Sequence, residues 1–420
     1  MWTFSKNKKE FDRNKTLIDG SLKSVLDDKK ISEALIKNSI EKLNNNKRIY
    51  IFSDHSDIRK QYSKELEKLG KVRDLNDKII NGYTTLGSII LDENKRNLTL
   101  SNISVFSNKD KNFVSKKELK NYNSNKIEDE KRKKEIELAI KNENHIDIEI
   151  TLKKHLQDQS NAFKKANPNI SICHIHDRGE DSVSYFEFVK NELKDDFVVR
   201  LKKTRNSNQF TINPKTKRKN FVKLIDAKFA NKSDYHIDKL TLKGKKYQQV
   251  KVTLEWDKLT LNEYDYSVVR VTLFKRDGNK IYKEPMMLIT SIPINSEILA
   301  KEIYHIYLLR ARIEGVFKFL KDVLGWEEFQ VRDWESIKNI IAICFFIGGY
   351  FYEIESELIK NETVIMICDL ANSKGKITRY FFLEGLRVLM MAYQVNIFRK
   401  ERNISDEFYA EMLSYAGVME

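Results

Sequence analysis

The spacing of hydrophobic residues in the first half of the chain predicts strands that alternate with helices. Several short runs are rich in β-branched and aromatic residues, and a helix is predicted between the last two of them, over about residues 182–193. The predicted strands are 48–53, 83–91, 97–106, 170–176 and 197–201. Three strands in succession favour an antiparallel meander, and the later β–α–β order adds crossover connections. Together they predict a mixed sheet with flanking helices, an α/β fold.

After residue 201 the pattern changes to strict alternation over short runs, with a hairpin turn at Asp277-Gly278. We interpret this part as a β-rich insertion, and the chain beyond Ser296 as helical. The expected divisions are an N-terminal helical region (1–47), a first part of the core (48–201), the basic insertion (202–295), a helix that completes the core (296–335) and a C-terminal helical region (336–420).

Composition narrows the class of protein. The longest apolar run, 340–352, is shorter than the roughly 18 to 20 residues of a membrane span, so we expect a buried helix there and no membrane partner. The N-terminus lacks the apolar stretch of a secretory signal. Three scattered cysteines, at 173, 344 and 368, have no zinc-type spacing. A cytoplasmic protein is the resulting expectation.

Positive charge is concentrated in one segment. The chain carries a net charge of +15, and residues 200–250 contain fifteen Lys or Arg against three Asp, a net +12. A coding bias toward Lys and Asn would spread charge evenly, so the clustering favours a polyanionic partner, of which nucleic acid is the usual one.

Two aspartates follow predicted strands. Asp54 ends the first and Asp177 ends the fourth, and if those strands are neighbours both acids emerge at one edge, where ligands of α/β sheets bind. For either residue alone, a turn or a helix cap is the commoner explanation. A third acid, Glu314, lies on a predicted helix, 307–321. At 100° per residue it shares one face with four other polar residues: Tyr307, Arg310, Lys318 and Lys321. Ordinary ion pairing along a helix could also explain this face.

These residues resemble a known family. Tyr307, Arg310, Glu314 and Lys321 reproduce the spacing of the YREK signature of bacterial insertion-sequence cut-and-paste transposases. The run IHDRGED, 175–181, resembles the family's second motif. IFSDHSD, 51–57, resembles the first, although His55 stands where the family usually has threonine, and Met286 and Ala311 stand at positions of base-holding aromatic residues.

The resemblance implies an RNase H-like core in which Asp54, Asp177 and Glu314 hold two Mg²⁺ (or Mn²⁺) ions, the hard cations that carboxylates bind. It implies a DDE transposase that cuts and joins double-stranded DNA at transposon ends and target sites, as a synaptic homodimer in the bacterial nucleoid. The N-terminal region would bind the DNA ends. Further DNA contacts are expected from Tyr307, Arg310, Lys318, Lys321, Arg200 and Lys202.

Alternatives remain open. Asp57 or Asp181 could replace one of the acidic ligands, and His174 and His176 could contribute to a metal site, although strand histidines are more often simply packed. An inactive relative that binds transposon ends and inhibits transposition would keep the basic surface. A stand-alone nuclease with the same core would cut DNA without terminal repeats.

Overall fold

In the computed structural model the described residues are 27–74, 76–142, 144–212, 218–242, 244–356 and 360–415. Most of the N-terminal region (1–47) and the basic residues Lys215, Lys217 and Lys243 lie outside them. The chain divides into two compact units, Met1–Gly348 and Gly349–Glu420. The first unit contains every strand of the described residues and all the predicted site residues.

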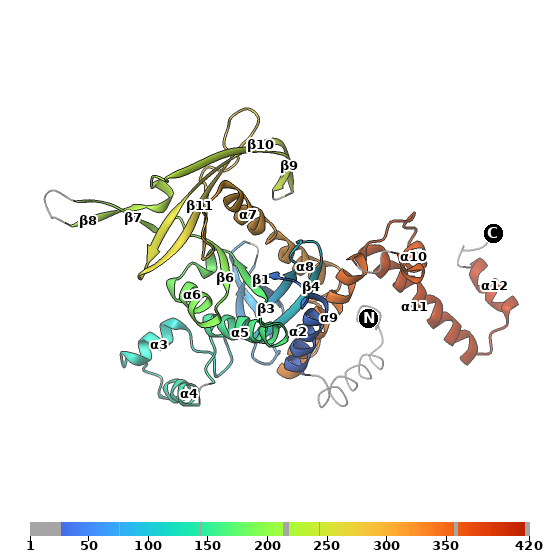
Figure 1. The fold of residues 1–420 in the computed structure, drawn as a ribbon. Coiled ribbons are helices and arrows are strands. Elements are labelled where there is room, and N and C mark those ends of the chain that lie inside the picture. Colours follow the sequence, from blue (N-terminus) through green and yellow to red (C-terminus); the bar gives the residue numbers. More distant parts are fainter. Residues whose placement is uncertain are drawn as a thin grey trace. The chain divides into compact units, whose positions relative to one another are not determined.

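A ten-stranded mixed sheet dominates the first unit, with helices on its faces (Figure 1). Its strands are β1 (Arg48–Arg59), β2 (Gly70–Arg73), β3 (Ile79–Leu91), β4 (Leu98–Phe106), β5 (Ser171–His176), β6 (Asp196–Arg200), β9 (Asn231–Leu242), β10 (Lys245–Leu261), β11 (Tyr264–Phe274) and β12 (Met286–Thr290). The strand order is β2-β3-β1-β5-β6-β12-β11-β10-β9, and β4 pairs with β3. A separate hairpin joins β7 (Asn206–Ile212) and β8 (Lys219–Lys223).

The helices of the described chain fall between and after these strands. They are α2 (Asp28–Leu43), α3 (Lys116–Asn123), α4 (Glu130–Lys141), α5 (Ile148–Ala166), α6 (Val183–Glu187), α7 (Glu297–Leu308), α8 (Ala311–Asp322), α9 (Trp334–Ser356), α10 (Glu362–Asp369), α11 (Arg379–Glu401) and α12 (Asp406–Tyr415), with short turns η2 (Arg178–Glu180), η3 (Phe188–Leu193) and η4 (Leu224–Asp226). The predicted α/β fold with a mixed sheet is confirmed, and it has the layered form of an RNase H-like core.

The predicted adjacency of the first and fourth strands is also confirmed. β1 and β5 pair in parallel with Phe52 opposite Ile175, while β1–β3 and β3–β4 form the expected antiparallel meander. One expectation was wrong: β1 does not end at Asp54. It continues to Arg59 because β3 still pairs with it there, placing Gly87 opposite Asp54. Only the pairing with β5 stops near the acid.

Residues of β3 show how helices cover both faces of the sheet. Neighbouring strand residues point to opposite faces. The Ser88 hydroxyl contacts His155 of α5 at 2.8 Å, so α5 lies on that face. A Cβ at Gly87 would lie 3.0 Å from the rings of Phe317 on α8 and Phe345 on α9, which therefore cover the other face. Glycine at position 87 lets α8 approach closely the strand that pairs with Asp54.

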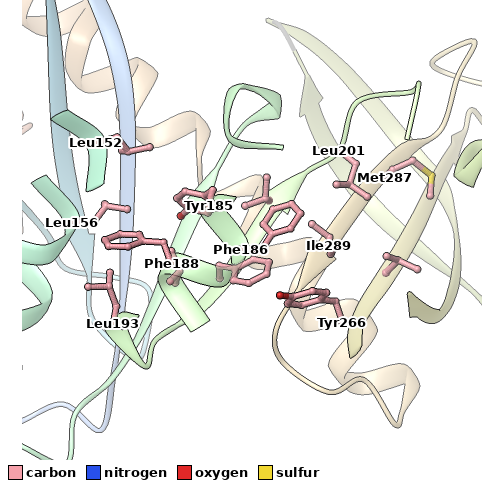
Figure 2. Packing of buried hydrophobic residues seen from close by; sticks show 14 of the residues in the cluster. Leu152, Leu156, Tyr185, Phe186, Phe188, Leu193, Leu201, Tyr266, Met287 and Ile289 are labelled. Carbon is pink, nitrogen blue, oxygen red and sulfur yellow. The ribbon is translucent and has the colours of Figure 1, made fainter. Parts of the chain in front are cut away.

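The insertion is an extension of the core sheet. β12 pairs antiparallel with β6, and β11, β10 and β9 follow in order. One hydrophobic cluster joins the two parts, because Phe186 and Phe197 of the core stack at 5.0 Å between ring centroids and both lie near Tyr266 of β11 (Figure 2). Packing across this junction fixes the insertion against the strands that carry the acids.

The predicted helix 307–321 is interrupted. α7 ends at Leu308 and α8 begins at Ala311, and the turn between them has tighter i→i−3 bonds, from the Arg310 amide to the Tyr307 carbonyl at 3.0 Å and from Arg312 to Leu309 at 2.9 Å. The single helical face drawn from a constant 100° per residue was therefore wrong in detail. Tyr307 ends one helix and Glu314 lies in the first turn of the next.

The expectation that no segment is long and apolar enough to cross a membrane needs correction. Among the described residues, Trp334–Glu355 and Arg379–Glu401 reach that length and mean hydropathy. The first is half buried, as in the core helix of a soluble protein, and the second is 11% buried. Polar residues such as Gln394 and Asn396 interrupt the apolar runs in the sequence, but the mean hydropathy of the helix still reaches that of a membrane span.

Buried His155 predicts loss of stability in acid. Its ring nitrogens contact Ser88 at 2.8 Å and Ser104 at 2.9 Å, and burial lowers its pKa to about 3. In the unfolded chain the pKa is about 6.5, so between these values only the unfolded state binds the proton. For this group, the free energy of unfolding should fall by about 1.4 kcal/mol per pH unit as pH drops below about 6.5.

Urea denaturation at several pH values between 7.5 and 4.5 measures this slope. His155→Gln should lower stability at neutral pH by about 1–3 kcal/mol, through the lost hydrogen bonds, and should make the decline with falling pH shallower. His236→Gln, at an exposed position, is the control and should keep the slope of the parent protein. Equal slopes in the parent protein and His155→Gln would show that this histidine does not couple folding to pH.

Candidate active site

Two of the three predicted acids occupy equivalent places on neighbouring strands. The parallel register of β1 and β5, with Phe52 opposite Ile175, brings Asp54 and Asp177 two residues further to the same edge of the sheet. This position follows from the pairing itself, since parallel strands end at one edge. Their side chains are 30% and 34% exposed, so both are partly shielded but reachable from solvent.

Arg310 lies between the first and third acids. Its guanidinium donates to Asp54 Oδ2 at 2.8 Å and also to Glu314 Oε1, one turn later in α8. Glu314 is 57% exposed, whereas Arg310 is only 14% exposed. Burial raises the pKa of Asp54, as do the charges of Glu314 and Asp177, while Arg310 opposes this shift. The other two acids thus act on Asp54, and Arg310 supplies the compensating charge.

Asp177 has its own partners. The Tyr307 hydroxyl donates to Asp177 Oδ1 at 2.9 Å, and a guanidinium nitrogen of Arg200 lies 3.9 Å from the same oxygen. Burial alone would raise the pKa of Asp177, but the hydrogen bond from the Arg178 amide and the charge of Arg310 bring it below its usual value. Burial and the charge of Asp177 raise the pKa of Tyr307 to about 12, so its hydroxyl stays protonated at neutral pH and acts as a donor.

The donor set suits a divalent cation, but its arrangement is not that of a formed metal site. Within the described ranges no three His, Cys, Asp or Glu side chains are grouped to hold a metal ion. Two carboxylates, Asp54 and Glu314, nevertheless contact the largely shielded Arg310, and the charge of Asp177 also acts on it, so positive charge is required at this place. Asp54, Asp177 and Glu314 could hold such an ion once Arg310 turns away.

The other predicted DNA contacts divide into two kinds. Lys318 and Lys202 are exposed. Lys321 is 17% exposed, donates to the Asp57 carbonyl at 2.6 Å and lies 3.5 Å from Glu327, which also binds Arg59. These contacts tie the end of α8 to β1. The role of Lys321 as a phosphate contact stays a prediction.

The alternative ligands have structural partners. Asp57 accepts from the Thr84 hydroxyl at 3.2 Å, and Asp181 accepts from the Lys202 amide at 2.7 Å and pairs with Arg205. His174 contacts Asp195 at 2.9 Å in the core. His176 is buried against Tyr185. These contacts account for the two aspartates, whereas His174 Nδ1 and His176 Nε2 are buried without a hydrogen-bond partner among the described residues.

One acid near the site was not singled out in the sequence. Burial and the charge of Glu149 raise the pKa of Glu180 to about 7, with a further contribution from Asp54. Its amide donates to the Asp177 carbonyl at 3.1 Å. In the sequence, Glu180 could be noticed only by its place in the run 175–181. Its pKa depends on the folded chain, which brings Glu149 of α5 and Lys202 after β6 close to it.

Comparison with known proteins identifies the domain. Residues 173–347 match the family model of the transposase DDE domain. No curated protein matches the chain. The matched region contains Asp177, Arg310 and Glu314, and Asp54 precedes it on β1, the strand that pairs with β5 of the matched region. The fold and this match agree: residues 173–347 are similar to the transposase DDE domain, a kind of domain whose partner is DNA.

Proposed function

We propose that this protein cuts DNA at the ends of a transposon and joins the freed 3′ ends to target DNA, with Asp54, Asp177 and Glu314 as its catalytic acids. The observation that supports this best is that Arg310 joins Asp54 to Glu314 while Asp177 lies near enough for its charge to raise the pKa of Asp54, beside a region that matches the transposase DDE domain. The protein would act as a homodimer that holds two ends together, in the bacterial cytoplasm at the nucleoid.

The side chains around the acids have separate tasks in this proposal. Two Mg²⁺ or Mn²⁺ ions, held by the three carboxylates, would activate the attacking oxygen and neutralise charge on the phosphate. Tyr307 keeps its proton and donates to Asp177, which orients that carboxylate. Arg310 balances the acids when they have no other counter-charge, and becomes available to a DNA phosphate when it leaves them. Arg200 is placed to approach the same phosphate from β6.

A binding protein without activity is the second possibility, and the ion pairs of Arg310 are the observation that favours it. If Arg310 never leaves Asp54 and Glu314, the acids cannot receive metal and the chain would only occupy transposon ends. Purified protein can be mixed with Mg²⁺ and a duplex taken from the DNA beside this gene, including any inverted repeats. Binding without strand cutting would support the inhibitor, and strand cutting would support the transposase.

Replacing Glu314 by glutamine should abolish cutting and preserve DNA binding. The change removes one charged ligand while keeping the size of the side chain. Even mutation of a residue that only hydrogen-bonds to a metal ligand typically lowers activity or metal affinity by about 10–100-fold. We therefore expect cutting of the labelled duplex to fall by more than about 100-fold. Fluorescence anisotropy with the same duplex should show equal or tighter binding.

The matched control for this variant lies on the same helix. Asp322→Asn removes the same charge at the exposed end of α8 and should cut like the parent protein. Full activity of Glu314→Gln would remove Glu314 from the active site.

Replacing Arg310 by glutamine should strengthen metal binding in the absence of DNA. Two unit charges about 4 Å apart interact by about 4 kcal/mol at an effective dielectric constant of 20. If removing the Arg310 charge recovers a third of that energy, metal affinity should rise about tenfold. The readout is the rise in melting temperature on adding Mn²⁺ to protein freed of metal. Asp177→Asn should reduce this rise. An unchanged or weaker response of Arg310→Gln would show that Arg310 does not compete with the ions.

A further inference from the structure

One edge of β1 loses its neighbouring strand beside the active site. β5 pairs with β1 only as far as Phe52, and no other described strand pairs with that edge further along. β1 itself continues to Arg59 by pairing with β3 alone. An open strand edge presents backbone N–H and C=O groups without partners. The edge beyond Asp54 therefore needs hydrogen-bonding groups from outside the sheet.

Two side chains, one from the end of α8 and one from the segment after it, occupy this open edge. The Lys60 amide donates to a carbonyl of β3 at 2.8 Å, so the amide of Arg59 points away from β3. That amide donates to Glu327 Oε1 at 2.9 Å. On the same side, the Lys321 ammonium donates to the Asp57 carbonyl at 2.6 Å. Lys321 and Glu327 thus satisfy two backbone groups that a neighbouring strand would otherwise bond.

Glu327 is the centre of these contacts. Its two carboxylate oxygens accept from the Arg59 guanidinium at 3.2 and 3.1 Å, and Oε1 lies 3.5 Å from the Lys321 ammonium. Burial alone would raise the pKa of Glu327, but the hydrogen bonds from Arg59 and the charge of Lys321 bring it below its usual value. The carboxylate is therefore charged at neutral pH, and it holds a cation of the strand and a cation of the helix together.

The turn after α8 brings Glu327 back to β1 independently of Arg59. Gly325 has a φ of +67°, a left-handed conformation that favours glycine and reverses the chain. Trp326 follows and is buried, with its ring stacked on Phe317 of α8 at 5.9 Å between centroids. Its amide donates to the Leu320 carbonyl at 2.9 Å. Packing of Trp326 thus fixes the turn, and Glu327 adds the link to the strand.

Polar contacts tie α8 to β1 at both ends of the helix. At the N-terminal end Arg310 donates to Asp54 of β1, and at the C-terminal end Glu327 holds Arg59 of the same strand. Glu314 lies between these two links. A slide of α8 along β1 would therefore change the distance between Glu314 and Asp54. If Arg310 leaves the acids, the link at Glu327 is the polar contact that still opposes such a slide.

We propose that Glu327 is a positioning residue of the active site, which fixes α8 along β1 and so sets where Glu314 lies relative to Asp54. This rests on the proposed function, in which these acids hold the ions and Arg310 leaves them. The link at Glu327 involves neither acid, so it stays closed while the ions enter.

Replacing Glu327 by glutamine tests this through metal binding. Glutamine keeps the size of the side chain but loses its charge, so the links to Arg59 and Lys321 weaken and α8 is free to shift. Affinity for Mn²⁺ is measured without DNA, from the electron paramagnetic resonance signal of free Mn²⁺. It should fall about tenfold, since loss of a residue that supports a metal ligand typically costs about 10–100-fold. Glu328→Gln removes the same charge at the exposed neighbouring residue and should bind Mn²⁺ like the parent protein.

A double-mutant cycle separates positioning from general damage. If Glu327 acts through Glu314, Glu327→Gln should weaken Mn²⁺ binding much less in a Glu314→Gln background than in the parent protein. Equal losses in both backgrounds, or no loss in either, would overturn the assignment. Should Glu327→Gln not fold at the assay temperature, Arg59→Gln breaks the same link from β1 and carries the same test.

Cutting of the labelled duplex is scored separately from metal binding. A parent protein whose Mn²⁺ affinity depends on Glu327 but which never cuts would refute the proposed function and leave the role of Glu327 standing. A parent protein that cuts, with Glu327→Gln cutting and binding Mn²⁺ equally well, would refute the role of Glu327 alone. A parent protein that binds no Mn²⁺ would refute both.

Discussion

Charge balance around Arg310 is the constraint on which the site depends. Asp54 and Asp177 at the sheet edge and Glu314 on α8 repel one another, and the burial of Asp54 increases the cost because fewer water molecules screen its charge. The guanidinium between Asp54 and Glu314 offsets that repulsion without any ligand. Under the proposed function, Arg310 would keep these acids together in the absence of metal ions, which would take over its charge-balancing role.

Backbone geometry places the carboxylates, and small residues allow it. Asp54 and Asp177 are positioned by the register of two parallel strands, which is fixed by buried side chains on both faces. Glu314 reaches them because α8 lies directly over Gly87, where a larger residue would meet Phe317 and Phe345. Placement of the third acid thus depends on the absence of a side chain on a strand that contributes no catalytic group.

Much of this was predictable from the sequence, and the failures have physical causes. Strands with strong β patterns, such as 83–91 and 170–176, were found, and adjacency of the two aspartates followed from topology. The extension of β1 beyond Asp54 was missed because its residues are polar there and the strand exists by pairing with β3. The turn at Arg310 was missed since helical periodicity hardly changes over one tightened turn. Lys321 was predicted as a DNA contact, and its pairing with Glu327 was missed because Glu327 becomes its neighbour only in the folded chain.

The unbroken ladder from β9 through β12 and β6 to β5 and β1 has a mechanical consequence. The insertion cannot swing on a linker as a separate module would, because its hydrogen bonds run in series into the two strands that space the aspartates. Any pull on the insertion is resisted by the stiffness of the whole sheet. The position of the insertion and the spacing of the two carboxylates are therefore set by one continuous sheet.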